Sequence, residues 1–262
     1  MTALPQDQET LMDTDVWVRD QSASRRARIR LFCFPYSGAG SSLYSGWRKA
    51  FPEEIAVMPV ELPGRGMRFA EPPFTRIEPL VGAAAMALMP LFSRPFALFG
   101  HSMGALAAFE LARYLQRNHG IQPTHLFVSG HGAPHLPDNG DHVHDLPDDE
   151  LVARLREMNG TPEEVLAHPE LRELLLPVLR ADFSVCETYR YLVGEPLGCP
   201  ISALGGLMDP YVDRDALNAW SIHTRSNFFM HMFSGDHFFL QSEESYVLQI
   251  LAFTLRQYLM SR

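Results

Sequence analysis

Short apolar runs rich in β-forming residues alternate with helical runs along most of this chain, and this alternation restricts the fold more than any other feature. The runs expected to form strands are 29–34, 55–60, 96–99, 124–129, 201–204 and 228–233, and those expected to form helices are 42–51, 77–93, 103–118, 213–223 and 243–260. Strands that alternate with helices form βαβ crossovers, whose strands are parallel. The sequence therefore predicts an α/β protein with a mostly parallel sheet flanked by helices on both faces.

The alternation stops over about 133–198, where no strand is evident. The segment 148–160 has the pattern of an amphipathic helix that is capped by Asp148 and ends at an Asn-Gly pair, and Pro162 begins another helix. An interruption of about 60 residues is too long for a connecting loop in a compact domain. Because such excursions often cover a site, we expect a helical lid insertion here.

The N-terminal segment 1–27 differs from the rest of the chain. Its first 14 or so residues are polar and acidic, so we expect a mobile tail, and 16–18 is expected to form a short edge strand. The remainder, 28–262, is expected to form one domain that carries the lid, because 262 residues are within range for one α/β domain with an insertion.

The composition excludes several classes of protein. A net charge of −9 argues against general nucleic-acid binding, which favours a basic face. The longest apolar stretch, 79–92, is too short to span a bilayer, and the N-terminus lacks the apolar region of a signal peptide. The three cysteines form no C-x-x-C pair, which suits a reducing compartment, so we expect a cytoplasmic protein.

A Gly-x-Ser-x-Gly motif, Gly100 to Gly104, lies where a predicted strand passes into a predicted helix. This is the context that a nucleophile elbow requires, because a tight turn there exposes the serine hydroxyl at the carboxyl edge of the sheet. The glycines are needed because a Cβ would clash with the neighbouring strand or helix. The motif therefore predicts Ser102 as a nucleophile.

A serine at its normal pKa is a weak nucleophile and needs a base. In proteins with a nucleophile elbow, the acid and then the histidine follow the serine in the sequence, each after a later strand. Of the eleven histidines, His237 follows the last predicted strand in a loop, whereas His231 lies inside that strand. We therefore expect His237 to be the base, and His101 to shape the turn beside Ser102.

Three aspartates follow the strand 201–204 and could orient His237. Asp209 comes directly after the strand and before a proline, where a turn can direct it at the histidine loop. Asp213 is expected to cap the next helix, and Asp215 to lie in its first turn. The sequence thus favours Asp209 as the acid of a Ser-His-Asp triad.

Backbone N–H groups can stabilise an oxyanion formed during attack by Ser102. Met103 would supply one N–H at the start of the helix. The second donor should come from the glycine-containing loop after the first parallel strand, where Tyr36 is the first choice and Ser37 the alternative. Pro35 has no N–H to donate.

Five motifs resemble those of the type II thioesterases that accompany polyketide and nonribosomal peptide synthetases. In sequence order they are FCFPYSGAGSS, ELPGRGMR, FGHSMGALAAFELA, GGLMDPYV and GDHFFL. The resemblance covers the chain from about residue 28 to the C-terminus. It implies an α/β-hydrolase fold with a helical lid, a triad of Ser102, Asp209 and His237, and oxyanion donors at the N–H groups of Tyr36 and Met103.

The resemblance also implies a function. This is hydrolysis of acyl thioesters on the phosphopantetheine arm of carrier-protein domains, which removes aberrant or stalled acyl groups from a synthase, and it needs no cofactor and no metal. Medium-chain acyl-carrier-protein thioesterases share the same pattern and are the alternative. A general carboxylesterase, and a catalytically silent module that binds an acyl chain or a synthase, are two further hypotheses.

For each of two groups of residues, the sequence allows two interpretations. Arg65 and Arg68 could hold their loop by hydrogen bonds, or bind a phosphate or an acidic carrier protein. The apolar residues of the lid could pack it onto the core or line an acyl pocket. They include Leu174, Leu175, Leu176, Val178, Leu179 and Phe183.

Overall fold

The computed structural model describes residues 13–19, 21, 26–137, 140 and 142–261. Within these ranges six parallel strands form one sheet in the order β2-β1-β3-β4-β5-β6. The strands are β1 (Ile29–Phe34), β2 (Ile55–Pro59), β3 (Phe96–His101), β4 (Leu126–Ser129), β5 (Ile201–Gly206) and β6 (Phe228–Phe233). The predicted mostly parallel sheet is confirmed, and each predicted strand is present with ends that shift by at most two residues.

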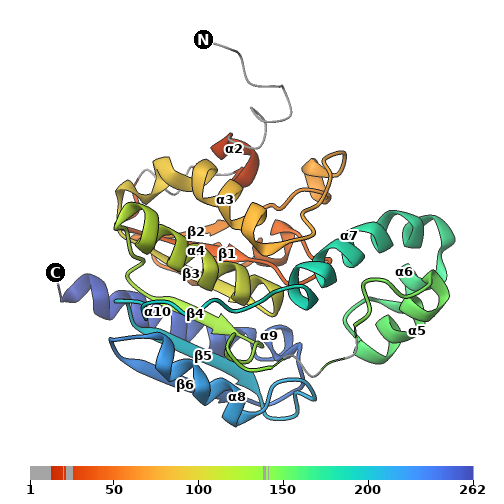
Figure 1. Cartoon of the computed structure of the whole chain (residues 1–262). Helices are drawn as coiled ribbons and strands as arrows, with labels where there is room; N and C mark the ends of the chain where they lie inside the picture. The colour runs from red at the N-terminus through yellow and green to blue at the C-terminus, as the bar shows by residue number, and fades with distance from the viewer. Residues whose placement is uncertain (1–12, 20, 22–25, 138–139, 141, 262) are drawn as a thin grey trace.

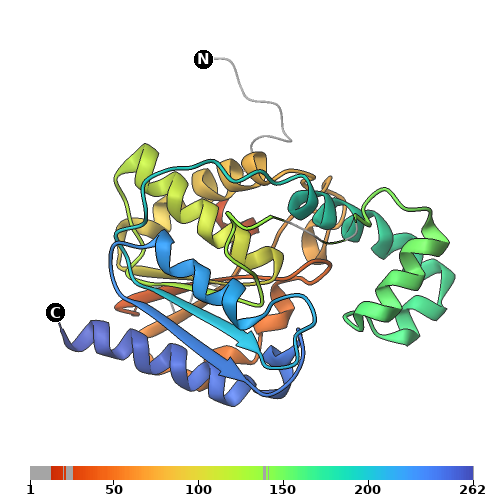
Figure 2. The same cartoon turned by 60° about the horizontal axis from the view of Figure 1, so that its bottom comes forward.

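Helices cover both faces of this sheet (Figures 1 and 2). The helices outside the insertion are α2 (Thr14–Trp17), α3 (Ile77–Leu88), α4 (Met103–His119), α8 (Arg214–Asn218), α9 (Phe239–Ser242) and α10 (Glu244–Met260). One apolar core lies between the sheet and α3 and α4, and a second lies between the sheet and α10. Because both faces are covered, the inner strands are buried along their whole length, while the edge strand β6 is mostly half-buried.

The prediction of an edge strand at 16–18 was wrong, because residues 14–17 form the short helix α2. The Asp13 side chain caps this helix by accepting the N–H of Asp15 at 2.9 Å. The Trp17 ring is fully buried beneath the guanidinium of Arg68, 4.5 Å from the ring centroid. Residues 1–12 of the predicted tail lie outside the described residues.

Two helix predictions need smaller corrections. The predicted helix 42–51 is two short 3₁₀ helices, Ser41–Tyr44 and Trp47–Ala50. Asp148 does not cap its helix, because Pro147 occupies the cap position and the Asp148 carboxylate pairs with Arg180 instead. Among the described residues, the other 3₁₀ helices are Gly66–Arg68, Met89–Ser93 and Ala219–His223.

Between β4 and β5 the described residues form three helices, which we call the helical insertion. They are α5 (Asp148–Met158), α6 (Glu163–Ala167) and α7 (Pro169–Glu187), and α5 and α6 lie to one side of the sheet (Figure 1). The insertion has its own small apolar core, to which Leu151 and Leu166 contribute fully buried side chains. The end of α7 is fastened to the entry of the insertion, because Glu187 accepts the backbone N–H of Val143 at 2.9 Å and that of His144 at 3.2 Å.

Among the described residues, no helix has both the length and the apolar character that a membrane span requires.

Candidate active site

Ser102 occupies a strained turn between β3 and α4. Its φ of 53° and ψ of −122° fall in a region that residues with a side chain rarely adopt. The two motif glycines make the turn sterically feasible. A Cβ on Gly100 would lie 1.9 Å from the carbonyl oxygen of Gly104, and a Cβ on Gly104 would lie 2.2 Å from that of Phe34. The local backbone thus has the geometry expected of a nucleophile elbow.

The elbow is fastened to the neighbouring strand β4. The N–H of Ser102 donates to the carbonyl oxygen of Ser129 at 2.8 Å. The fully buried ring of His101 places Nδ1 2.9 Å from Ser129 Oγ, and burial lowers the pKa of His101 well below its ordinary value. His101 therefore stays neutral. Its contact with Ser129 beside the elbow is consistent with the prediction that it helps to shape the turn.

Asp209 and His237 meet at the carboxyl edge of the sheet. His237 Nδ1 donates to Asp209 Oδ2 at 2.8 Å, and the exposed fractions of the two side chains are 13% and 0%. The other carboxylate oxygen, Oδ1, accepts the N–H of Tyr211 at 2.9 Å and that of Val212 at 3.2 Å. The backbone thus holds the carboxylate toward the ring, which leaves Nε2 of His237 free to act as a base.

The loops after β5 and β6 come together because Gly206 lacks a side chain. A Cβ there would lie 2.3 Å from the carbonyl oxygen of Asp236. His237 is thereby placed next to the elbow, since its ring centroid lies 5.2 Å from that of His101. The structure thus gathers Ser102, Asp209 and His237 at one edge of the sheet, while their catalytic roles stay predictions.

The residues that the sequence set aside are found in other roles. Asp213 caps α8 by accepting the N–H of Ala216 at 2.8 Å, and Asp215 lies in the first turn of that helix. His231 lies within β6.

The loop after β1 begins beside the elbow, because Phe34 is paired with Gly100 in the sheet. The first turn of α4 approaches this loop closely, since a Cβ on Gly104 would lie 2.7 Å from the carbonyl oxygen of Pro35. The Tyr36 ring packs edge-on against His101 at 5.8 Å and against Phe238 at 5.5 Å between centroids. The predicted donor segment, Tyr36 and Ser37, thus lies next to both the elbow and the histidine loop.

The helical insertion contacts the site from two sides. On one side, Leu179 of α7 lies against Gly38, whose Cβ would come 2.6 Å from Leu179 Cδ2. On the other, Gly160 lies against the residue after His237, since its Cβ would come 2.4 Å from Cζ of Phe238. Of the apolar lid residues, Leu176, Val178 and Leu179 are buried, Leu175 and Phe183 are partly buried, and Leu174 is half exposed.

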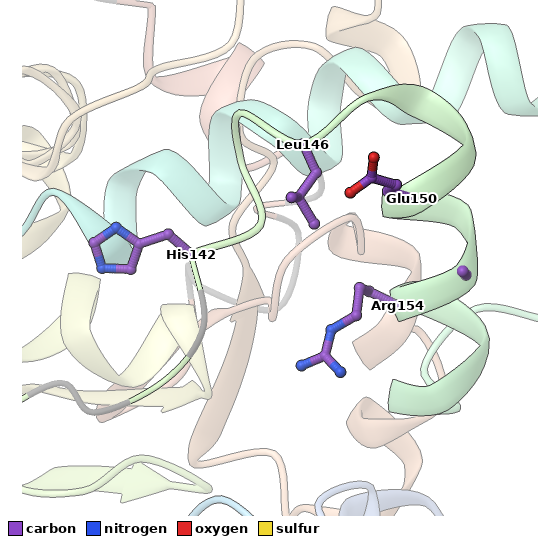
Figure 3. A pocket seen from close by; sticks show the side chains of 5 residues that line it. His142, Leu146, Glu150 and Arg154 are labelled. Atoms are coloured by element: carbon purple, nitrogen blue, oxygen red, sulfur yellow. The ribbon is translucent and has the colours of Figure 1, made fainter.

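An open pocket of about 510 Å³ is lined by His142, Leu146, Glu150, Ala153 and Arg154 of the insertion and its entry. In Figure 3, Leu146, Glu150 and Arg154 surround one space, with Glu150 and Arg154 projecting from α5. Burial raises the pKa of the Tyr211 hydroxyl, and the charge of Arg154 acts on it in the opposite direction. Because the Tyr211 ring also packs against His237, with 5.6 Å between centroids, this part of α5 lies near the Asp209–His237 pair.

Within the described ranges, no group of three or more His, Cys, Asp or Glu side chains is arranged to hold a metal ion.

Comparison with known proteins places the chain in a family. A family model described as Thioesterase domain matches residues 29–257. The chain belongs to the thioesterase domain family. The thioesterase is 48% identical over 255 residues to a protein named linear gramicidin dehydrogenase LgrE, from Brevibacillus parabrevis, with 96% of this chain and 97% of that protein covered. It is 44% identical over 240 residues to gramicidin S biosynthesis protein GrsT from Aneurinibacillus migulanus, with 92% and 94% covered.

A solved structure shows the same relationship. The thioesterase superposes on the type II thioesterase BorB from the borrelidin biosynthetic cluster with a TM-score of 0.82 and 41% identity, over 91% of this chain and 97% of that one. The predicted α/β-hydrolase fold and the predicted resemblance to type II thioesterases are therefore confirmed.

The sequence reasoning missed a set of buried charges around the loop after β1. The sequence predicts no role for Asp182 of α7 or for Glu61, yet both are buried and accept hydrogen bonds from this loop. The sequence allows two interpretations of Arg65, and its pairing with Asp182 supports a role in holding the loop rather than in binding a phosphate or a carrier protein. The available signal in the sequence was a carboxylate between two apolar residues, Ala181 and Phe183, of a helical run.

Proposed function

We propose that this thioesterase hydrolyses acyl thioesters on the phosphopantetheine arm of carrier-protein domains and thereby removes aberrant or stalled acyl groups from a polyketide or nonribosomal peptide synthase. The observation that carries the proposal is the Asp209–His237 hydrogen bond beside the strained elbow of Ser102, at one edge of the sheet. The two gramicidin-pathway relatives and BorB support the synthase context.

The proposed reaction begins when His237 Nε2 takes the Ser102 proton as the serine oxygen attacks the thioester carbonyl. The resulting oxyanion is held by the backbone N–H groups of Tyr36 and Met103. The carbon–sulfur bond then breaks, and the proton on His237 passes to the departing pantetheine sulfur. This step leaves an acyl ester on Ser102 and a free carrier-protein thiol.

A water molecule completes the cycle. His237 takes a proton from the water as its oxygen attacks the acyl ester, and the same N–H groups hold the second oxyanion. The ester bond breaks, Ser102 regains its proton from His237, and the carboxylic acid departs. Asp209 remains ionised throughout and stabilises the imidazolium that forms twice in each cycle.

We propose that the helical insertion borders the path of the acyl group to Ser102. Leu179 of α7 lies against Gly38, and Gly160 in the turn after α5 lies against Phe238. We propose that the arm enters between these two contacts, near the pocket lined by Leu146 and Arg154. A partly apolar passage of this kind accommodates an acyl chain and limits the access of water.

The chemistry proposed here uses side chains and backbone N–H groups alone, so we propose that no cofactor or metal takes part. None of the three cysteines is in a disulfide, which is consistent with the proposed location in a reducing cytoplasm. The name of one relative includes the word dehydrogenase. The loop after β1 does not match the dinucleotide-binding motif G-x-G-x-x-G, because Leu43 stands at the position of its third glycine.

A direct test compares three substrates that carry the same acyl group: an acyl carrier protein, a free pantetheine thioester and an oxygen ester. We expect the highest kcat/KM with the carrier protein, and loss of turnover in Ser102→Ala. A preference for the oxygen ester would contradict the proposal and favour a general carboxylesterase. A series of carrier proteins from acetyl to dodecanoyl separates editing from chain release, because strong selection for medium chains would favour the fatty-acid alternative.

A further inference from the structure

A buried ion pair joins the helical insertion to the loop that follows β2. Arg65 Nη1 lies 2.7 Å from Asp182 Oδ2 and Arg65 Nη2 lies 2.8 Å from Asp182 Oδ1, so the pair is bidentate. The exposed fractions of the two side chains are 7% and 2%. A two-point contact of this kind fixes orientation as well as distance.

The same ion pair holds the loop after β1. Asp182 Oδ2 also accepts the N–H of Gly38 at 2.7 Å, and Arg65 Nη1 also donates to the carbonyl oxygen of Ala39 at 3.2 Å. The two charged groups therefore hold the peptide units on both sides of one turn. That turn is closed by the N–H of Ala39, which donates to the carbonyl oxygen of Tyr36 at 3.0 Å.

A second buried carboxylate fixes the far end of this loop. Glu61 is 5% exposed and accepts the N–H of Ser41 at 3.3 Å and its hydroxyl at 2.6 Å. The segment 36–41 is thus tied to Glu61 and Arg65 of the loop after β2 and to Asp182 of α7, which are far apart in the sequence. Packing of the insertion does not by itself require this network, because Leu176 and Leu179 already bury apolar surface there.

We infer that Asp182 and Arg65 are positioning residues for the oxyanion hole, which hold segment 36–41 so that the Tyr36 N–H points at the reacting oxygen. The inference rests on the proposed serine mechanism. It makes α7 part of the catalytic apparatus, because a displacement of this helix would move the donor loop. A donor must lie about 3 Å from the oxyanion to stabilise it, so a small shift of the loop is costly to the reaction.

Asp182→Asn is the sharpest test, because three N–H donors converge on this carboxylate. An amide presents one acceptor oxygen and one NH₂ group, so at least one donor would face another donor. We expect kcat for a short acyl N-acetylcysteamine thioester to fall on the order of 10²-fold, while KM changes by less than about threefold because ground-state binding is retained.

Inhibition by an alkylboronic acid provides a second measurement. Its inhibition constant would not change if Asp182 had only a structural role. Its boron bonds to Ser102 Oγ, the serine proton passes to His237, and the tetrahedral adduct places an oxygen in the oxyanion hole. We expect the inhibition constant of Asp182→Asn to rise by about the same factor as kcat falls. A loss of kcat with an unchanged inhibition constant would overturn the inference.

Glu187→Gln is the matched control. Glu187 is also a buried carboxylate on α7 that accepts backbone N–H groups, but those groups belong to Val143 and His144 at the entry of the insertion. We expect this variant to lower the melting temperature while kcat and the boronic-acid inhibition constant stay within about threefold of the wild type. Equal losses in both variants would show that Asp182 acts only through stability and would overturn the inference.

Arg65→Lys keeps the test decisive if Asp182→Asn does not fold. Lysine retains the positive charge but cannot make the bidentate contact and the bond to Ala39 together. We expect a smaller loss of kcat, about tenfold, with a matching rise in the inhibition constant. A wild-type protein that neither cleaves the thioester nor binds the boronic acid would overturn the serine mechanism itself, and the inference with it.

Discussion

The Asp209 carboxylate accepts a 2.8 Å hydrogen bond from Nδ1 of His237, while its second oxygen is held by two backbone N–H groups. The carboxylate has no proton to give, so Nδ1 must carry the hydrogen and Nε2 is left with a lone pair. This relationship sets the tautomer that a general base requires. It also distinguishes Asp209 from Asp213, which lies nearby in sequence but caps α8.

Asp209→Asn should lower kcat by about 10³- to 10⁴-fold, because an amide no longer holds the reactive tautomer of His237. Asp213→Asn is the control, since asparagine caps a helix about as well as aspartate and the side chain has no role at the site. Steady-state kinetics with a carrier-protein thioester measure both. Comparable losses in the two variants would refute the assignment of Asp209.

Gly104→Ala should destabilise the fold by about 3 kcal/mol, because the new Cβ would lie 2.2 Å from a backbone oxygen of Phe34 that has no room to move. Gly82→Ala, inside α3, is the matched control. Nothing lies within 4 Å of its new Cβ, so this change should stabilise the protein by about 0.5–1 kcal/mol through helix propensity. Urea unfolding of both variants checks the difference, and a stable Gly104→Ala would show that the elbow is not tightly packed.

Stability should fall as the pH drops below about 6.5 because of His125. Burial lowers its pKa in the folded state to about 3, with a smaller contribution from the charge of His231. Below pH 6.5 the unfolded chain therefore binds a proton that the folded protein does not. The contribution of His125 is complete above its unfolded pKa and is lost toward pH 3, with about 2 kcal/mol lost between pH 6.5 and 4.5.

His125→Gln tests this prediction, because glutamine does not titrate and can still bond to Ser202 Oγ, which lies 2.8 Å from His125 Nε2. The free energy of unfolding of this variant should change less between pH 6.5 and 4.5 than that of the wild type. An equal change in the two proteins would mean that other groups cause the acid sensitivity. His223, whose pKa burial lowers to about 4, acts in the same direction in both proteins.

Local sequence signals predicted the elements that place the proposed site. The strand that ends at His101 and the helix that begins at Met103 follow from an apolar run and an Ala/Leu-rich run on either side of glycines. Asp209 was distinguishable from Asp213 because only Asp213 stands directly before a helical run. Each of these inferences depends on residues adjacent in the chain, whose steric and capping preferences are independent of the rest of the fold.

The same local signals could not predict contacts between residues far apart in the sequence. Trp17 lies in a β-like run, but the cap at Asp13 and burial against Arg68 make the segment helical. Asp182 meets Arg65 across 117 residues of sequence, and no local pattern encodes that pairing. Tertiary packing decided both cases, and it overrides the weak preferences of short segments.

Ser102→Gly should be more stable than Ser102→Ala by about 1 kcal/mol, although both variants lack the nucleophile. Ser102 has a φ of 53°, which glycine adopts freely and alanine does not, so glycine releases backbone strain that alanine keeps. Urea unfolding of the two variants measures the difference, and equal stabilities would show that the elbow stores no strain.

Asn159→Gly is the matched control for that strain. Asn159 also has a positive φ, of 55°, but it ends α5 in the ordinary left-handed conformation that asparagine tolerates. This substitution should therefore change stability by only a few tenths of a kcal/mol and leave kcat unchanged. The gain in stability of Asn159→Gly over the wild type is compared with the gain of Ser102→Gly over Ser102→Ala. Equal gains would mean that glycine stabilises any position with a positive φ, and that the turn at Ser102 is not specially strained. A gain confined to Ser102 means that the fold bears a conformational cost specific to the residue that the proposed reaction uses.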